Sequence, residues 1–178
     1  MKDSNFKALI GLAAAVIILS GCANYTITVP LEKRLDTDTT CRIGAISDNL
    51  PPDLTADEKP TVEDIAMFKN QLDAYLSELS YFEITEGADH SFRYIINGAI
   101  YDYNKGSGVG RFLFGSLTNS DARLGISLEL IDANTGSVVF SGYFKSKVTD
   151  WSTSGDEVYN NCARDFAKAL KKEMRKFD

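Results

Sequence analysis

The sequence is poor in the residues that catalytic and metal sites most often use. It contains a single histidine, His90, and three cysteines, Cys22, Cys41 and Cys162. A Ser-His-Asp triad needs a histidine that is oriented by a carboxylate beside a nucleophile, and no serine is placed for that role. Zinc sites need clustered ligands, whereas these cysteines lie far apart in the chain. The sequence therefore predicts no enzyme, no metal and no cofactor.

Nucleic acids and nucleotides are also disfavoured as ligands. Lys and Arg number 19 against 25 Asp and Glu, for a net charge of −6, and phosphate binding needs clustered basic residues. The glycine-rich stretch 106–110 is followed by Arg111 and Phe112. A phosphate-binding loop would instead continue with Gly-Lys-Ser or Gly-Lys-Thr into a helix. We interpret the stretch as a tight or flexible connection between two strands.

The chain has one long apolar run, and that run is too short to span a membrane. Residues 8–19 follow a short polar start that carries two lysines. A spanning helix needs roughly 20 apolar residues, whereas this length is typical of a secretory signal. The run ends in Leu19-Ser20-Gly21-Cys22. This ending resembles the bacterial lipobox, whose cysteine receives diacylglycerol, becomes the first residue after cleavage and often gains a further acyl chain such as palmitate.

The lipobox divides the chain into three parts: a signal peptide (1–21), a lipidated tether (22–40) and a folded domain (41–178). Two or three acyl chains give stable membrane anchoring. Ala23 does not resemble an inner-membrane retention signal, so we expect the periplasmic face of the outer membrane. The tether lacks a helical period, although Tyr25, Ile27 and Val29 alternate with threonines. A short edge strand before Pro30 is thus possible.

Hydrophobic periodicity predicts an α+β domain. Apolar residues recur every three to four positions over 61–79 and 154–177, which indicates two amphipathic helices. Thr61 with Asp64, and Ser154 with Glu157, resemble capping boxes at their starts. Alternating patterns predict strands at 41–47, 81–85, 92–103, 124–130 and 138–148, the last two joined as a hairpin. We expect a single mixed or antiparallel sheet with both helices on one face.

Cys41 and Cys162 remain once Cys22 is lipidated. The periplasm is oxidising, and leftover cysteines of an exported domain often pair. Cys41 falls on the first predicted strand, and Cys162 on the apolar face of the last helix. We therefore predict a disulfide between them, with two buried free thiols as the alternative.

An apolar group within the glycine-rich connection is the main candidate for partner binding. It could form an adaptable apolar surface with arginine at its rim, or it could belong to the core. Trp151, just before the last helix, is a second candidate with the same alternative. The candidate residues are Val109, Arg111, Phe112, Phe114, Leu117 and Trp151.

Two short stretches carry a family resemblance. Residues 100–106 read Ile-Tyr-Asp-Tyr-Asn-Lys-Gly, and 128–136 read Leu-Glu-Leu-Ile-Asp-Ala-Asn-Thr-Gly, with Arg111 and Gly115 between them. This pattern resembles an uncharacterised family of Gram-negative lipoproteins, domain of unknown function 4410. The resemblance implies a fold similar to small periplasmic α+β domains, such as the amino-terminal domain of the Tol propeller protein and the core of curli-type secretion lipoproteins. It implies no catalytic residues.

These patterns together lead us to expect a non-enzymatic lipoprotein that binds an envelope protein or polymer. An accessory subunit of an envelope transport or secretion complex is the alternative. A hydrolase of envelope polymers is a third hypothesis, which would need a pocket with paired acidic residues. The oligomeric state stays open.

Overall fold

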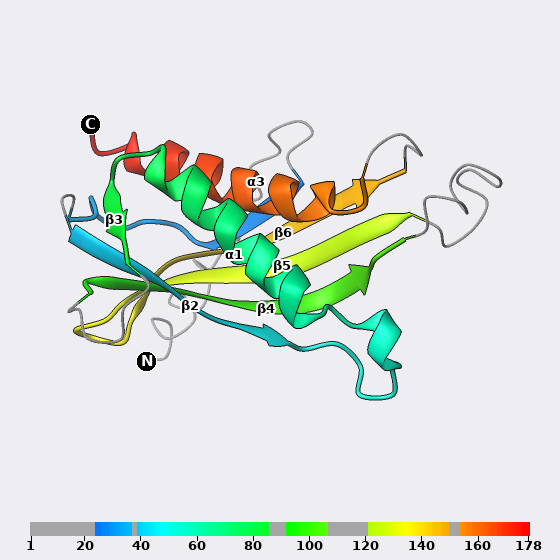
Figure 1. Ribbon diagram of the computed structural model, residues 1–178. Coiled ribbons are helices and arrows are strands. Elements are labelled where there is room, and N and C mark those ends of the chain that lie inside the picture. The colour runs from blue at the N-terminus through cyan, green and yellow to red at the C-terminus, as the bar shows by residue number, and fades with distance from the viewer. Residues whose placement is uncertain (1–23, 37–38, 86–91, 107–120, 150–153) are drawn as a thin grey trace, which may run out of the picture.

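The computed structural model describes residues 24–36, 39–85, 92–106, 121–149 and 154–178. These residues form one six-stranded sheet with two long helices side by side on one face (Figure 1). The prediction of an α+β fold is thereby confirmed. The elements are β1 (Tyr25–Val29), β2 (Thr39–Asp48), the short 3-10 helix η1 (Ala56–Glu58), α1 (Val62–Ser77), β3 (Phe82–Ile84), β4 (Tyr94–Asn104), β5 (Ala122–Asp132), β6 (Val138–Val148) and α3 (Glu157–Met174).

The sheet is mixed, in the spatial order β1-β6-β5-β4-β2-β3. Antiparallel pairing joins β4, β5, β6 and β1, and β2 runs parallel to both β4 and β3. Parallel strands need a long crossover, and α1 supplies it between β2 and β3. The β5–β6 hairpin closes where the Gly136 N–H donates to the Asp132 carbonyl at 2.8 Å. Gly136 has φ +71°, a conformation that glycine adopts without strain.

The core lies between the helices and the inner face of the sheet. Alternate residues of β5, such as Leu124, Leu128 and Leu130, are 0–1% exposed. On α3, Phe166 packs its ring 5.4 Å from that of Phe144 on β6. Each fully buried side chain of this size stabilises the fold by roughly 1.5–3 kcal/mol. The apolar faces predicted for both helices are thus the faces that pack on the sheet: Phe68, Leu72 and Leu76 in α1, and Val158, Cys162, Phe166, Leu170 and Met174 in α3.

Residues 24–36 belong to the fold, so the description of 22–40 as a tether needs correction for this stretch. β1 pairs with β6 at the edge of the sheet and ends before Pro30. Leu31 and Leu35 follow, and only 6% and 3% of their surface is exposed. The segment is held in place because burial of these two side chains offsets the entropy lost in ordering it.

The predicted disulfide is absent: Cys41 and Cys162 are buried free thiols. Cys41 on β2 is in register with Tyr94 on β4, which is in turn opposite Asp132 on β5. The thiol of Cys162 instead lies 3.8 Å from the Leu124 carbonyl, near the other end of β5. Leu124 and Asp132 are about 26 Å apart at roughly 3.3 Å per residue. A disulfide needs Cα atoms within about 7 Å.

Candidate functional site

The predicted lipid attachment residue, Cys22, lies outside the described part of the chain. So do the residues predicted to contact a partner: Val109, Arg111, Phe112, Phe114, Leu117 and Trp151. Their roles stay predictions. The described residues that flank 107–120 and those that flank 150–153 lie close together at one end of the sheet. Arg123 is in register with Asn104, Ala122 is in register with Val148, and a Cβ on Gly155 would lie 2.8 Å from the Lys105 carbonyl.

A buried polar cluster centres on Asp64 at this end of the sheet. Asp64 forms the predicted capping box of α1: the Thr61 N–H donates to its carboxylate at 2.9 Å, and its own N–H donates to the Thr61 hydroxyl at 3.2 Å. The Tyr103 hydroxyl donates to the same carboxylate at 3.0 Å. Tyr159 donates to Tyr103 at 3.3 Å, and the Lys105 amine lies 3.6 Å from Asp64. The cluster therefore ties β4 and both helices together.

The protonation states in this cluster suit a structural role. Burial raises the pKa of Tyr103 to about 12 and raises that of Tyr159 as well. Burial would also raise the pKa of Asp64, but hydrogen bonds from Thr61 and Tyr103 and the charge of Lys105 together hold that pKa below its ordinary value. At neutral pH the carboxylate is charged and the tyrosines are neutral donors, so all hydrogen bonds of the cluster are made.

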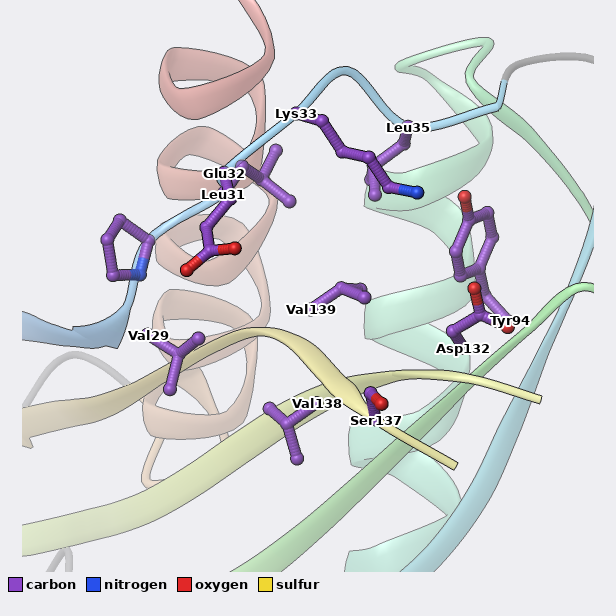
Figure 2. A pocket seen from close by; sticks show the side chains of 11 residues that line it. Val29, Leu31, Glu32, Lys33, Leu35, Tyr94, Asp132, Ser137, Val138 and Val139 are labelled. Atoms are coloured by element: carbon purple, nitrogen blue, oxygen red, sulfur yellow. The ribbon is translucent and has the colours of Figure 1, made fainter. Parts of the chain in front are cut away.

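A pocket of about 420 Å³ lies beneath the segment that follows β1 (Figure 2). Its volume falls in the range of small-molecule sites, about 300–1,000 Å³. Figure 2 shows Glu32 and Lys33 on the segment that crosses the pocket, with Tyr94 and Asp132 together at one side. The lining residues are Val29, Pro30, Leu31, Glu32, Lys33, Leu35, Tyr94, Asp132, Ser137, Val138 and Val139.

The buried polar groups of this pocket are occupied by contacts within the protein. Asp132 is 5% exposed, and its carboxylate pairs with Arg93 at 2.7 Å and accepts the N–H of Asn134 at 2.9 Å. The Tyr94 hydroxyl accepts the Asp36 N–H at 3.1 Å. These contacts fasten the crossing segment and the β5–β6 turn. We therefore regard the pocket as a result of how the segment after β1 packs on the sheet.

The face of the sheet opposite the helices is polar, and none of the described helices packs on it (Figure 1). On β6 this face carries Ser141, Tyr143, Lys145 and Lys147, which alternate with core residues. Tyr143 is 48% exposed, and its ring meets that of Tyr101 edge to face at a centroid distance of 5.5 Å. Burial raises the pKa of Tyr101 to about 12. The face thus presents one exposed aromatic ring among polar groups.

Basic side chains gather on this face at the corner nearest the start of the described chain. The Lys145 N–H donates to the carbonyl of Asn24, the first described residue, at 2.7 Å. Lys147 lies further along β6, in register with Arg123 on β5. The other end of the face mixes Glu129 with Arg42. This corner was not predicted from the sequence, although Lys145 and Lys147 occupy alternate positions between Phe144 and Val148, a pattern that indicates a solvent-facing side.

Two other kinds of site are not found among the described residues. No group of three or more His, Cys, Asp and Glu side chains there is placed to hold a metal ion. Within the same residues, no helix is both long enough and apolar enough to cross a membrane.

Comparison with known proteins shows what this fold is similar to. No family of known proteins matches the chain, and no curated protein sequence matches it. Among solved structures, the PelC dodecamer from Paraburkholderia phytofirmans is 15% identical, with a TM-score of 0.59 over 84% of this chain and 97% of that one. The protein XCC0632 from Xanthomonas campestris, assigned to the family of unknown function 330, is 10% identical, with a TM-score of 0.53 over 85% and 94%. Lipoprotein GNA1162 from Neisseria meningitidis is 11% identical, with a TM-score of 0.46 over 77% and 97%.

The first two likenesses show a shared α+β fold and nothing beyond it. At this level of identity the same fold can serve unrelated functions. The resemblance to domain of unknown function 4410, and to the Tol and curli-type domains, is not confirmed by these comparisons.

Proposed function

We propose that this protein is a bacterial envelope lipoprotein, anchored through acylated Cys22 to the periplasmic face of the outer membrane, whose domain is a non-enzymatic binding or scaffolding module. One observation carries the proposal, namely that the lipobox directly precedes the fold. Only Ala23 separates Cys22 from Asn24, whose carbonyl is hydrogen-bonded to β6. Two Cα–Cα steps span at most about 7.6 Å, so the anchored domain would rest close to the bilayer.

The arrangement of buried polar groups supports a binding role over a catalytic one. The carboxylate of Asp64 caps α1 and binds Tyr103, and that of Asp132 binds Arg93 and the hairpin turn. Catalytic acids and bases need a proton to exchange with a substrate, whereas these groups bind other parts of the protein. The polar face of the sheet, on which none of the described helices packs, is the surface that we propose for a partner.

Metabolic labelling tests the anchor. Cells that express the full-length protein are fed an alkyne analogue of palmitate, and the protein is purified from fractionated membranes. We expect label on the wild type in the outer-membrane fraction, and loss of both label and membrane retention in Cys22→Ser. An unlabelled wild-type protein, or retention that does not depend on Cys22, would contradict the proposal.

Photocrosslinking in cells tests the binding surface. A photoreactive amino acid is placed at Thr28 or Glu129, both exposed on the polar face, and in a control variant at Asn70, exposed on α1. We expect the first two positions to give the same adduct and the control position to give none. Equal adducts from all three positions would indicate contact without a specific surface.

A multi-copy assembly is the second candidate, favoured by the likeness to a protein whose crystal structure is a dodecamer. In that case the partner would be another copy of this chain within a transport or secretion complex. Native mass spectrometry of the detergent-solubilised lipoprotein separates the two candidates. A discrete oligomer supports the assembly, whereas a monomer that crosslinks to a different envelope protein supports the binding module.

A further inference from the structure

The corner of the polar sheet face next to Asn24 has a distinctive composition. We call it the anchor-side patch, defined by Arg123, Tyr143, Lys145 and Lys147. Lys145 and Lys147 are exposed, and Tyr143 is 48% exposed. β6, which carries three of these residues, is the direct neighbour of β1, so it lies about 4.8 Å from the strand that continues the anchor.

We propose that the anchor-side patch docks on anionic phospholipid headgroups of the membrane that holds the acyl chains. The inference rests on the proposed lipidation of Cys22 and deepens it, because it fixes which side of the domain faces the bilayer. The Lys145 backbone touches Asn24 at 2.7 Å. Because Cys22 is at most about 7.6 Å from Asn24 in Cα distance, an anchored chain keeps this corner beside the headgroups.

The charge of the patch suits an anionic surface. The whole chain has a net charge of −6, whereas this corner of the sheet carries basic side chains. The patch presents three cations. Two acids lie near it: Asp121 is 6% exposed and pairs with Lys147 at 2.7 Å, and Asp102 is in register with Gly125. Electrostatic attraction reaches about one Debye length, roughly 8 Å at physiological salt, and Cys22 lies within about that distance of Asn24, whose carbonyl is hydrogen-bonded to the Lys145 backbone.

The aromatic ring of the patch fits the same partner. Tyrosine is enriched at membrane–water interfaces because its ring is apolar and its hydroxyl is polar. Tyr143 projects from the face beside Lys145, and the Lys145 amine lies 5.7 Å from the centroid of the Tyr101 ring. Tyr101 thus contacts two of the three exposed side chains of the patch, Tyr143 and Lys145.

Lysine footprinting on the intact lipoprotein tests the proposal. The acylated protein is reconstituted into phosphatidylcholine vesicles with or without phosphatidylglycerol and treated with a membrane-impermeant amine-acetylating reagent. Labelling rates are read by mass spectrometry. A lysine near an anionic surface contributes about fivefold in affinity, so we expect Lys145 and Lys147 to react at least about fivefold more slowly on the anionic vesicles. High salt should restore their reactivity, and Lys145→Gln should partly restore that of Lys147.

Lys33 and Lys69 serve as internal controls, because they lie beyond the other end of β1 and on α1. Their labelling should be the same on both kinds of vesicle. Equal labelling of Lys145 and Lys147 on neutral and anionic vesicles would overturn the proposal, as would protection seen in native membranes but not on anionic vesicles, which would assign the patch to a protein partner. Palmitate on Cys22 is measured in the same samples, so a failure of docking is distinguished from a failure of the anchor.

Discussion

Removal of the Asp64 carboxylate should weaken the fold more than any other single charge change on α1. The side chain is 3% exposed and accepts hydrogen bonds from the Thr61 N–H and the Tyr103 hydroxyl. Asp64→Ala deletes both and leaves the buried Tyr103 hydroxyl without its acceptor. Loss of a helix cap costs about 0.5–2 kcal/mol, and an unsatisfied buried polar group costs about 1–3 kcal/mol. We expect unfolding free energy to fall by about 2–4 kcal/mol.

Urea denaturation of the detergent-solubilised protein, followed by circular dichroism, measures this loss. Asp73→Ala is the matched control, since Asp73 lies on the same helix and accepts an exposed hydrogen bond from Ser77 at 3.0 Å. The control should change unfolding free energy by less than about 0.5 kcal/mol. Equal losses in the two variants would refute the reasoning that burial and the contact with Tyr103 make Asp64 special.

The pH dependence provides a second check. Burial raises the pKa of Asp64, but hydrogen bonds from Thr61 and Tyr103 and the charge of Lys105 outweigh it, so the folded pKa lies below the unfolded one. Such a group stabilises the fold above its unfolded pKa, about 3.9 for Asp, and this contribution is lost as pH falls through the folded pKa. The advantage of wild type over Asp64→Asn should therefore be constant from about pH 7 to 5 and shrink below about pH 4. A difference that grows on acidification would refute the assignment.

Three further changes test other parts of the fold. Cys41 and Cys162 should react with a thiol reagent only after denaturation, because both are buried and burial raises the pKa of Cys41 to about 12. Intact-mass analysis of the denatured protein, alkylated without reductant, should count two modified thiols. A disulfide in their place would contradict the structure. Leu35→Ala should lower the free energy of unfolding in urea by about 2–4 kcal/mol if residues 24–36 are part of the core. An unchanged free energy would support the predicted tether instead. Gly98→Ala should cost about 1–3 kcal/mol, since the added Cβ would lie 2.8 Å from two core side chains. Gly136→Ala is the contrasting control, because a Cβ there meets no neighbouring atom and only the positive φ is strained. An unchanged melting temperature for Gly98→Ala would refute the predicted clash.

The fold could be predicted because its signals are local. The helical period of Phe68, Leu72 and Leu76 and the alternation in β5 and β6 are each contained in one element. The Thr61–Asp64 capping box was also readable, since its two residues are three positions apart. The matching prediction for Ser154 and Glu157 was wrong. α3 begins after Asp156, and Ser154 donates to the Asp156 carboxylate instead.

What could not be predicted depends on contacts between distant parts of the chain. Leu31 and Leu35 are buried in a segment without regular structure, where no period marks an apolar residue as core. The distance between Cys41 and Cys162 follows from the registers of β2 with β4 and of β4 with β5, which the sequence alone does not show. The anchor-side patch likewise arises from the pairing of β1 with β6.

The packing of residues 24–36 also changes what an anchored domain of this kind could reach. A free tether over 22–40 would extend roughly 60 Å at about 3.3 Å per residue, enough to approach partners well away from the membrane. With β1 paired to β6 and Leu31 and Leu35 in the core, only the link from Cys22 to Asn24 remains, which spans at most about 7.6 Å. Under the proposed lipidation, the domain would therefore meet partners that are themselves in the membrane or that extend to its surface.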